Sequence, residues 1–340
     1  MTHEINRRTA LSLLAGSALL PGLPNAAFAA GYPDRPVHFV VPFPPGGAVD
    51  IVARTISDKA GPLLGQTIIV DNRPGASGNI AYGYVTKAEP DGCTAVIGSN
   101  NLATNEALFD DLTFKQSDLA PVVWIGYSPL MLLVAPDFPA KTVKDLVDMA
   151  KTKPGSLTFA SAGTGTSGHL AAEIFKQVTG IEALHVPYKG GAPAMIDVMA
   201  GRVSFLFIDP VQGMAQVRGN KLRTIAVSSP ERLSLLPDVP TVAEAGFPGV
   251  EAVVWWGFLV PAKTPPAIIA KLNKDLDGAL HDERVKATLA DMGAVVKGGS
   301  ADDFRNFIAS ETVKWTKIIK AANIKGEGAA DAFLRRHAPA

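Results

Sequence analysis

Cysteine is almost absent from this chain, which has 340 residues and a single thiol, Cys93. One cysteine excludes an intramolecular disulfide and a zinc site built from cysteine ligands. The six histidines show no H-E-x-x-H motif or comparable ligand spacing. We therefore expect neither a metal site nor a cofactor.

The chain also lacks an excess of either charge. Lys and Arg together number 32, Asp and Glu also number 32, and the formal net charge is +0. Nucleic-acid binding and polybasic membrane binding both need clustered positive charge, so we expect neither partner. The composition, 47% hydrophobic and 19% charged, is typical of a globular protein with enough apolar residues for two cores.

Hydrophobic runs long enough to cross a membrane are missing too. The apolar stretch Thr9–Leu20 is too short for a span, and it follows the basic pair Arg7-Arg8. Ala27-Phe28-Ala29 then supplies an A-x-A cleavage pattern. We predict that residues 1–29 are a signal peptide, cleaved near Ala29, and that the product is exported. The arginine pair resembles a twin-arginine signal, and ordinary secretion is the alternative.

What the chain does contain is a regular alternation of predicted strands and helices. It begins with the strand Val37–Val41 and the amphipathic helix Ala48–Leu64, which Gly65 ends. A second series includes the helix Val143–Lys151 and the strand Leu157–Ala160. This alternation predicts an α/β protein with parallel sheets covered by helices.

Two long apolar segments, Val122–Ala135 and Val250–Val260, separate the two series. We interpret them as two crossings between domains. Domain 1 would comprise residues 30–133 and 254–325, and domain 2 residues 134–253. Residues 326–340 would form a loosely held tail.

Two glycine-rich turns stand out, each between a strand and a helix. The first turn is Pro42-Phe43-Pro44-Pro45-Gly46-Gly47, and the second turn is Gly163-Thr164-Gly165-Thr166-Ser167. Glycine permits positive φ and close approach of the backbone to a ligand, and the first N–H groups of a helix have no intrahelical acceptor. Together the turns predict two facing surfaces that bind a small anion.

Neither turn contains Arg or Lys, which indicates recognition by backbone N–H and hydroxyl groups. A hydrogen bond to a charged group contributes about 1.5–3 kcal/mol, and a helix dipole about 0.3–2 kcal/mol. Four or five such donors could bind a carboxylate without a cationic side chain. The alternative is structural: each turn only starts its helix.

Two enzyme motifs overlap the second turn. Residues 163–168 satisfy G-x-G-x-x-G, but the next strand ends at Val186-Pro187-Tyr188-Lys189 without an acidic residue for a ribose. Residues 165–169 lack the second glycine of a nucleophile elbow. Both enzyme motifs are therefore incomplete. An exported α/β hydrolase or dehydrogenase is the alternative to a binding protein.

The two turns belong to a longer series of motifs. The series is Tyr32-Pro33-Asp34-Arg35-Pro36, the first turn with Asp50 and Arg54, Asn72-Arg73-Pro74-Gly75-Ala76, Pro90-Asp91-Gly92, the second turn with His169, Val186-Pro187-Tyr188-Lys189-Gly190, and Leu236-Pro237-Asp238-Val239-Pro240-Thr241 with Glu244 and Gly246. In this order the motifs closely resemble those of the tripartite tricarboxylate transporter substrate-binding receptors, the Bug family of periplasmic receptors. The resemblance covers nearly the whole mature chain.

The resemblance implies a two-domain periplasmic binding protein fold, a type II Venus flytrap with two interdomain crossings. It implies a receptor, not an enzyme, that binds a small carboxylate in the interdomain cleft: a di- or tricarboxylate, an amino acid or an aromatic acid. The receptor, expected as a monomer, would deliver its ligand to the membrane subunits of a tripartite tricarboxylate transporter. A ligand-sensing partner of a membrane sensor is a further alternative.

The resemblance also implies which residues bind the ligand: Phe43, Gly46 and Gly47 on the first turn, Gly163, Thr164, Gly165, Thr166 and Ser167 on the second, and Asp209. For Asp209 the alternative is an end-of-strand cap. The candidates for specificity follow strand ends, and they are Ser99, Asn100, Asn101, Tyr188 and Lys189. Trp255 and Trp256 are expected to pack at the hinge.

Overall fold

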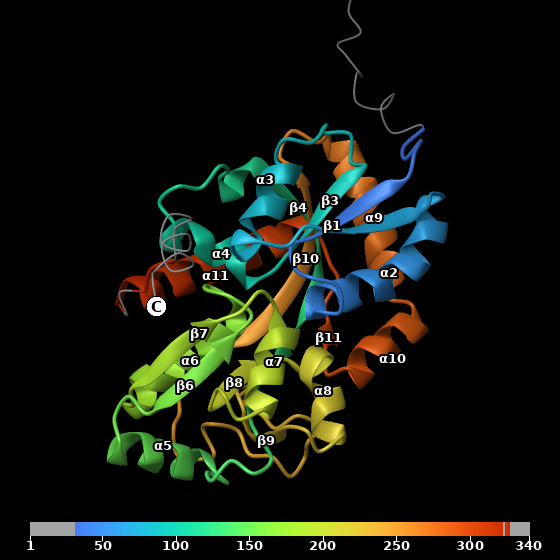
Figure 1. Cartoon of the computed structure of the whole chain (residues 1–340). Helices are drawn as coiled ribbons and strands as arrows, with labels where there is room; N and C mark the ends of the chain where they lie inside the picture. Colours follow the sequence, from blue (N-terminus) through green and yellow to red (C-terminus); the bar gives the residue numbers. More distant parts are fainter. Residues whose placement is uncertain (1–30, 322–323, 327–340) are drawn as a thin grey trace, which may run out of the picture.

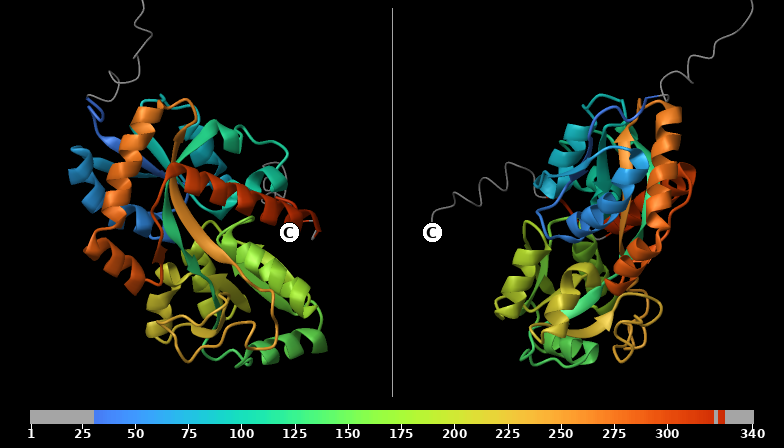
Figure 2. Two further views of the ribbon diagram at one scale, coloured as in Figure 1. Left: turned by 180° about the vertical axis from the view of Figure 1, so that it is seen from behind. Right: turned by 90° about the vertical axis from the view of Figure 1, so that its right-hand side faces the viewer.

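The computed structural model describes residues 31–321 and 324–326. It has two lobes, each built on one sheet with helices around it (Figures 1 and 2). The predicted signal peptide and nearly all of the predicted tail lie outside the described residues.

The first lobe contains a six-stranded sheet in the order β11-β4-β10-β3-β1-β2. β1 is parallel to β2 and β3, whereas β10 is antiparallel to β3 and β4. The strands are β1 (Val37–Val41), β2 (Ile68–Asn72), β3 (Thr94–Gly98), β4 (Leu119–Pro129), β10 (Val253–Pro261) and β11 (Val295–Val296).

The second lobe contains a five-stranded sheet in the order β7-β6-β8-β5-β9. β6 is parallel to β7 and β8, and β5 is antiparallel to β8 and β9. The strands are β5 (Met131–Val134), β6 (Leu157–Ser161), β7 (Ala183–Pro187), β8 (Phe205–Ile208) and β9 (Arg223–Val227).

Helices cover both sheets. In the first lobe the C-terminal helices pack beside N-terminal elements, α9 against α2 and α11 against α4 (Figure 1). This lobe has α2 (Ala48–Leu64), α3 (Asn79–Val85), α4 (Asn100–Leu108), α9 (Pro266–Leu280), α10 (Glu283–Asp291), α11 (Ala301–Ala321) and the 3-10 turns η1 (Ala76–Gly78) and η2 (Gln116–Asp118). The second lobe has α5 (Val143–Thr152), α6 (Ser167–Thr179), α7 (Gly191–Met199) and α8 (Pro210–Arg218).

The chain passes between the lobes twice. It leaves the first sheet at Pro129 and enters the second at Met131, and it returns as β10. The long strands β4 and β10 pair with each other from Val253↔Pro129 to Pro261↔Leu119. Both predicted apolar segments therefore form the crossings, as strands of one antiparallel ribbon (Figure 2).

Buried aromatic residues anchor the return crossing. Trp255 and Trp256 are both 0% exposed, and Trp255 makes edge contacts with Phe304 and Phe307 of α11. Both tryptophans are therefore buried in the strand that returns to the first lobe, and Trp255 packs on α11 of that lobe. Among the residues that the structure describes, no helix is long and apolar enough to cross a membrane.

Candidate functional site

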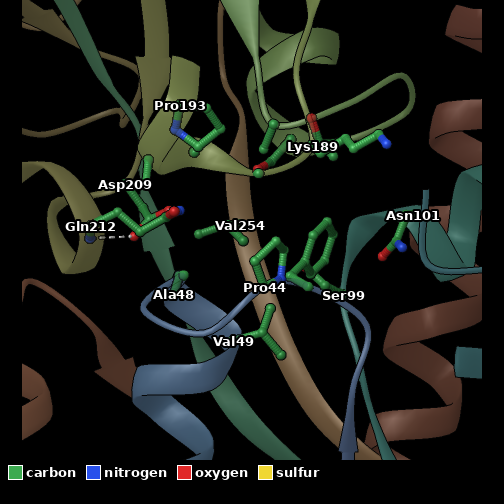
Figure 3. Close-up of a pocket in the computed structure, with 18 of the residues that line it drawn as sticks. Pro44, Ala48, Val49, Ser99, Asn101, Lys189, Pro193, Asp209, Gln212 and Val254 are labelled. Carbon is green, nitrogen blue, oxygen red and sulfur yellow. Dashed lines mark hydrogen bonds between the residues drawn. The ribbon is translucent and has the colours of Figure 1, made fainter. Parts of the chain in front are cut away.

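A pocket lies between the lobes, where the two glycine-rich turns face each other (Figure 3). It encloses about 570 Å³ of empty space, including a mouth that is open to solvent. Figure 3 shows Ala48 and Val49 of the first lobe on one side of Val254, and Pro193 and Asp209 of the second lobe on the other. Among the residues that line it, all in the described ranges, Lys189 is the one cation.

Five of the described helices begin at this pocket. Their N-cap residues, which all line it, are Gly47 of α2, Ser99 of α4, Thr166 of α6, Gly190 of α7 and Asp209 of α8. Only Asp209 caps its helix with its own side chain. Because the other four helix starts have no side-chain cap, their first N–H groups and their dipoles give the pocket a positive potential.

The first turn is fixed by a buried carboxylate. Asp50 accepts hydrogen bonds from the Gly46 N–H at 2.9 Å, from Asn72 Nδ2 at 2.9 Å and from Arg54 Nε at 3.1 Å. Burial raises the pKa of Asp50, but the bonds from Arg54, Gly46 and Asn72 together outweigh it, so the pKa is lowered. The Gly46 N–H is thus engaged inside the turn. The first intrahelical bond of α2 runs from Ile51 N to Gly47 O at 3.0 Å. Ala48 and Val49 precede it, so their N–H groups have no acceptor within the helix and lie at its pocket end.

The second turn is fixed in a similar way by histidine. The Gly165 N–H donates to His169 Nδ1 at 3.1 Å, and the Gly163 N–H donates to Ser161 Oγ at 3.2 Å. Burial, with His185 nearby, lowers the pKa of His169 well below its usual range, so the ring stays neutral and Nδ1 can accept. Where this turn lines the pocket, the donors left are the first N–H groups of α6 and the hydroxyl of Ser167, since intrahelical bonding begins at Leu170.

The lobes touch directly beside the pocket. Thr104 on α4 of the first lobe donates its hydroxyl to Gly165 O of the second turn at 3.1 Å. Gly165 has φ +80, and a Cβ there would lie 2.5 Å from Leu108 Cδ1 and 3.1 Å from Thr104 Oγ1. The positive φ favours glycine here, and any larger residue would require the Leu108 side chain to move where the second turn meets α4.

Asp209 and Gln212 form one polar wall of the pocket (Figure 3). Asp209 Oδ1 accepts the Gln212 N–H at 3.1 Å, and Oδ2 accepts Gln212 Nε2 at 2.8 Å. Burial raises the pKa of Asp209, and the hydrogen bonds from Gln212 oppose this rise. Asp209 is thus both an end-of-strand cap and a lining residue.

The structure brings half of the predicted binding residues to the pocket. Those that line it are Phe43, Gly47, Ser99, Thr166, Ser167 and Asp209. The residues Gly46, Asn100, Gly163, Thr164, Gly165 and Tyr188 are not among its lining. Two further specificity candidates, Asn101 and Lys189, do line it.

Besides Gly46, Gly163 and Gly165, two more of the predicted residues have partners of their own. Asn100 donates to Val253 O at 2.9 Å and accepts from Trp255 N at 3.2 Å, so it fixes the start of β10. The hydroxyl of Tyr188 donates to Asp197, and burial together with this bond raises the pKa of Tyr188 to about 12.

The sequence predicts a helix over Ala192–Ala200, but the place of its start in the pocket was not predicted. Gly190, Gly191, Ala192 and Pro193 line the pocket. The signal was available, because Gly190-Gly191 follows the strand β7 as Gly46-Gly47 follows β1. The other lining residues not predicted are Pro44, Pro45, Ala48, Val49, Ala162, Gln212 and Val254.

Within the described ranges, no group of three or more His, Cys, Asp or Glu side chains is placed to hold a metal ion. The pocket is built from helix starts, hydroxyls and apolar side chains, together with the polar side chains of Asn101, Lys189, Asp209 and Gln212. Two α/β lobes, two crossings and a pocket between the lobes define a two-domain solute-binding protein of the periplasmic type.

The chain belongs to the tripartite tricarboxylate transporter family of receptors, whose family model matches residues 52–324. Receptors of this family are periplasmic. The curated relative BugT of Bordetella pertussis is 34% identical over 297 residues, which are 86% of this chain and 91% of BugT.

Solved structures show the same fold. An R. palustris protein solved with adipate has a TM-score of 0.84 and 35% identity, covering 87% of this chain and 100% of that one. MatC from Rhodopseudomonas palustris, solved with bound malate, has a TM-score of 0.81 and 30% identity, covering 85% of this chain and 100% of MatC.

Proposed function

We propose that this protein binds a small carboxylate between its lobes and delivers it to the membrane subunits of a tripartite tricarboxylate transporter. The observation that carries the proposal is the convergence of four helix starts without side-chain caps on one pocket. Such starts bind anions through backbone N–H groups. The adipate and malate bound to two relatives of the same fold support a carboxylate here.

The carboxylate would accept hydrogen bonds from N–H groups at the starts of α2, α6 and α7 and from the Ser167 hydroxyl. Because these donors come from both lobes, a ligand bridges them only when the lobes are together, and it stabilises the closed state by this difference in affinity. The receptor acts as a monomer and performs no chemistry on its ligand. It is exported after cleavage near Ala29.

We also propose the domain limits that the sheets favour. Domain 1 comprises residues 30–129 together with 253–325, and domain 2 comprises residues 131–252. These limits place the whole of β5 (Met131–Val134) in the second domain, three residues before the boundary expected from the sequence.

The test is calorimetric titration of the purified protein with adipate, malate, citrate, glutamate and benzoate. At least one acid is expected to bind with micromolar affinity, about −8 kcal/mol, and to be recovered unchanged. Steady turnover of any acid would favour the enzyme alternative, and indifference to all of them would contradict the proposal.

Gly165→Ala sharpens this test, with Gly155→Ala as the matched control. Both glycines have positive φ, +80 and +72, but a Cβ at Gly155 meets nothing within 4 Å. Each change costs about 1–2 kcal/mol of backbone strain. Only Gly165→Ala also pushes the second turn away from Leu108, so it alone should weaken acid binding, by at least about tenfold. Equal affinities of the two variants would show that the turn does not need to approach α4.

A further inference from the structure

We propose that Gln212 makes this pocket select carboxylates with a hydrogen-bond donor on the carbon next to the carboxylate, such as 2-hydroxy or 2-amino acids. The inference rests on the proposed function, because it assigns a substrate class to the same pocket. It is carried by the orientation and the place of one side-chain oxygen, Gln212 Oε1.

The orientation of the Gln212 amide is set by Asp209. Both carboxylate oxygens of Asp209 accept from Gln212, Oδ1 from its backbone N–H at 3.1 Å and Oδ2 from Nε2 at 2.8 Å. A carboxylate offers only acceptors, so the NH₂ group must face Asp209. The carbonyl oxygen Oε1 is then directed to the other side, away from the start of α8.

Two glycines locate Oε1 between the lobes. An added Cβ would lie 2.3 Å from Oε1 at Gly191 and 3.8 Å from it at Gly47. Gly191 begins α7 in the second lobe, and Gly47 is the N-cap of α2 in the first. Oε1 therefore stands between two of the helix starts that would bind the ligand carboxylate, and the absence of a side chain at Gly191 leaves the space for it.

Oε1 is an acceptor in a pocket whose helix starts are all donors. Among the hydrogen bonds of the described residues, none is donated to Oε1. A ligand with only carboxylates and methylene groups would approach it with acceptors or apolar atoms and leave it unpaired. A hydroxyl or ammonium group next to the bound carboxylate would donate to it, and the buried carboxyl of Asp209 beside it favours such a donor further.

Lys189 does not provide this discrimination. It lies across the pocket from Asp209, and its side chain is directed away from Gln212 (Figure 3). A cation there would attract a second carboxylate equally in a substituted and an unsubstituted diacid. We therefore assign the discrimination between substituted and unsubstituted diacids to the polar wall of Asp209 and Gln212.

The experiment compares three four-carbon diacids by calorimetry: L-malate, L-aspartate and succinate, which differ only in carrying a hydroxyl, an ammonium group or hydrogen. For the unaltered protein we expect malate or aspartate to bind at least about tenfold more tightly than succinate, because a site that hydrogen-bonds a substituent rejects the analogue without it. Gln212→Met keeps the length of the side chain and removes the acceptor. It should bring the ratio of the succinate dissociation constant to that of malate or aspartate close to one, mainly by weakening the binding of the substituted acid.

The matched control is Gln216→Met, the same change one turn later on α8, at a residue that does not line the pocket. It should keep the original ratio. Gly191→Ala is a second variant, since its Cβ would displace Oε1 while Gln212 stays intact. It should reduce the ratio as well, and circular dichroism of each variant checks its fold.

Several outcomes would overturn the inference without touching the proposed function. One is succinate bound as tightly as malate and aspartate. Another is a preference that persists in both Gln212→Met and Gly191→Ala. A third is tighter binding of all three acids by Gln212→Met, which would show that the amide only fills the pocket. If no carboxylate binds the unaltered protein, the proposed function itself fails.

Discussion

At the scale of single residues, Asp50 gives the clearest dependence on pH. Its folded pKa is lowered, so the stability it contributes is present above the unfolded pKa of about 3.9 and is lost as pH falls through the folded value. Asp50→Asn should lower the free energy of unfolding by about 1–3 kcal/mol at pH 7. The difference from the unaltered protein should shrink below about pH 4.

Urea unfolding at pH 7 and pH 3 measures this difference. Asp58→Asn is the control, because Asp58 is an exposed residue of the same helix, and it should change the free energy by less than about 0.5 kcal/mol. If Asp50→Asn lowers the free energy of unfolding equally at both pH values, the effect comes from changed packing and hydrogen bonding and not from the lost charge.

Residue types alone predicted where the two turns lie, but not which of their N–H groups are free. The family resemblance implied that Gly46 and Gly165 bind the ligand. In the structure each N–H is taken by a side chain four residues later, Asp50 or His169. Whether such a side chain turns back to the helix start or away from it depends on its rotamer and its neighbours, and the sequence does not specify these.

At the scale of elements, a negative charge at the start of α7 should stabilise the helix but weaken the binding of the acid. Ala192 is the second residue of α7 and lines the pocket. Ala192→Asp would stabilise the helix by about 0.3–1 kcal/mol through its dipole. The same carboxylate would compete with the ligand, so acid binding should weaken at least about tenfold.

Ala267→Asp is the matched control, because Ala267 is the second residue of α9, which begins away from the pocket. It should show the gain in thermal stability and unchanged affinity by calorimetry. If both variants bind acids equally well, the start of α7 is not part of the anion site.

Helix prediction succeeded where a helix has one buried face. The bounds of α2 were predicted to the residue, because its apolar side chains recur at helical spacing and Gly65 ends it in the left-handed conformation. α4 was missed because Asn100–Asn105 are buried regardless of polarity, so no apolar stripe marks it. α8 was missed although Asp209-Pro210 is a typical helix start, because Asp209 was assigned to ligand binding or to a strand end and not to a helix cap.

At the scale of the whole molecule, the contact between Thr104 and Gly165 links the two lobes. It exists only while the lobes are together, so it favours the closed state. Thr104→Val keeps the shape and removes the bond, and should weaken acid binding by about 0.5–1.5 kcal/mol, up to about tenfold. Small-angle scattering at saturating ligand should still show the compact form.

Thr55→Val serves as the control for this change, since the Thr55 hydroxyl bonds to Ile51 O within its own helix. Its affinity for the acid should stay that of the unaltered protein. If Thr104→Val binds the acid as tightly as the unaltered protein, the contact between Thr104 and Gly165 does not stabilise the closed state.

The two sheets also differ in whether their strands come from one continuous segment of the chain. All five strands of the second lobe come from one continuous stretch, residues 131–227, whereas the first sheet needs residues 37–129 and then 253–296. During folding, the second lobe can form from neighbouring segments alone. The first lobe must bring together segments from both sides of the second, so we expect its sheet to be completed only when the late strand β10 is available, after the second lobe can already have formed.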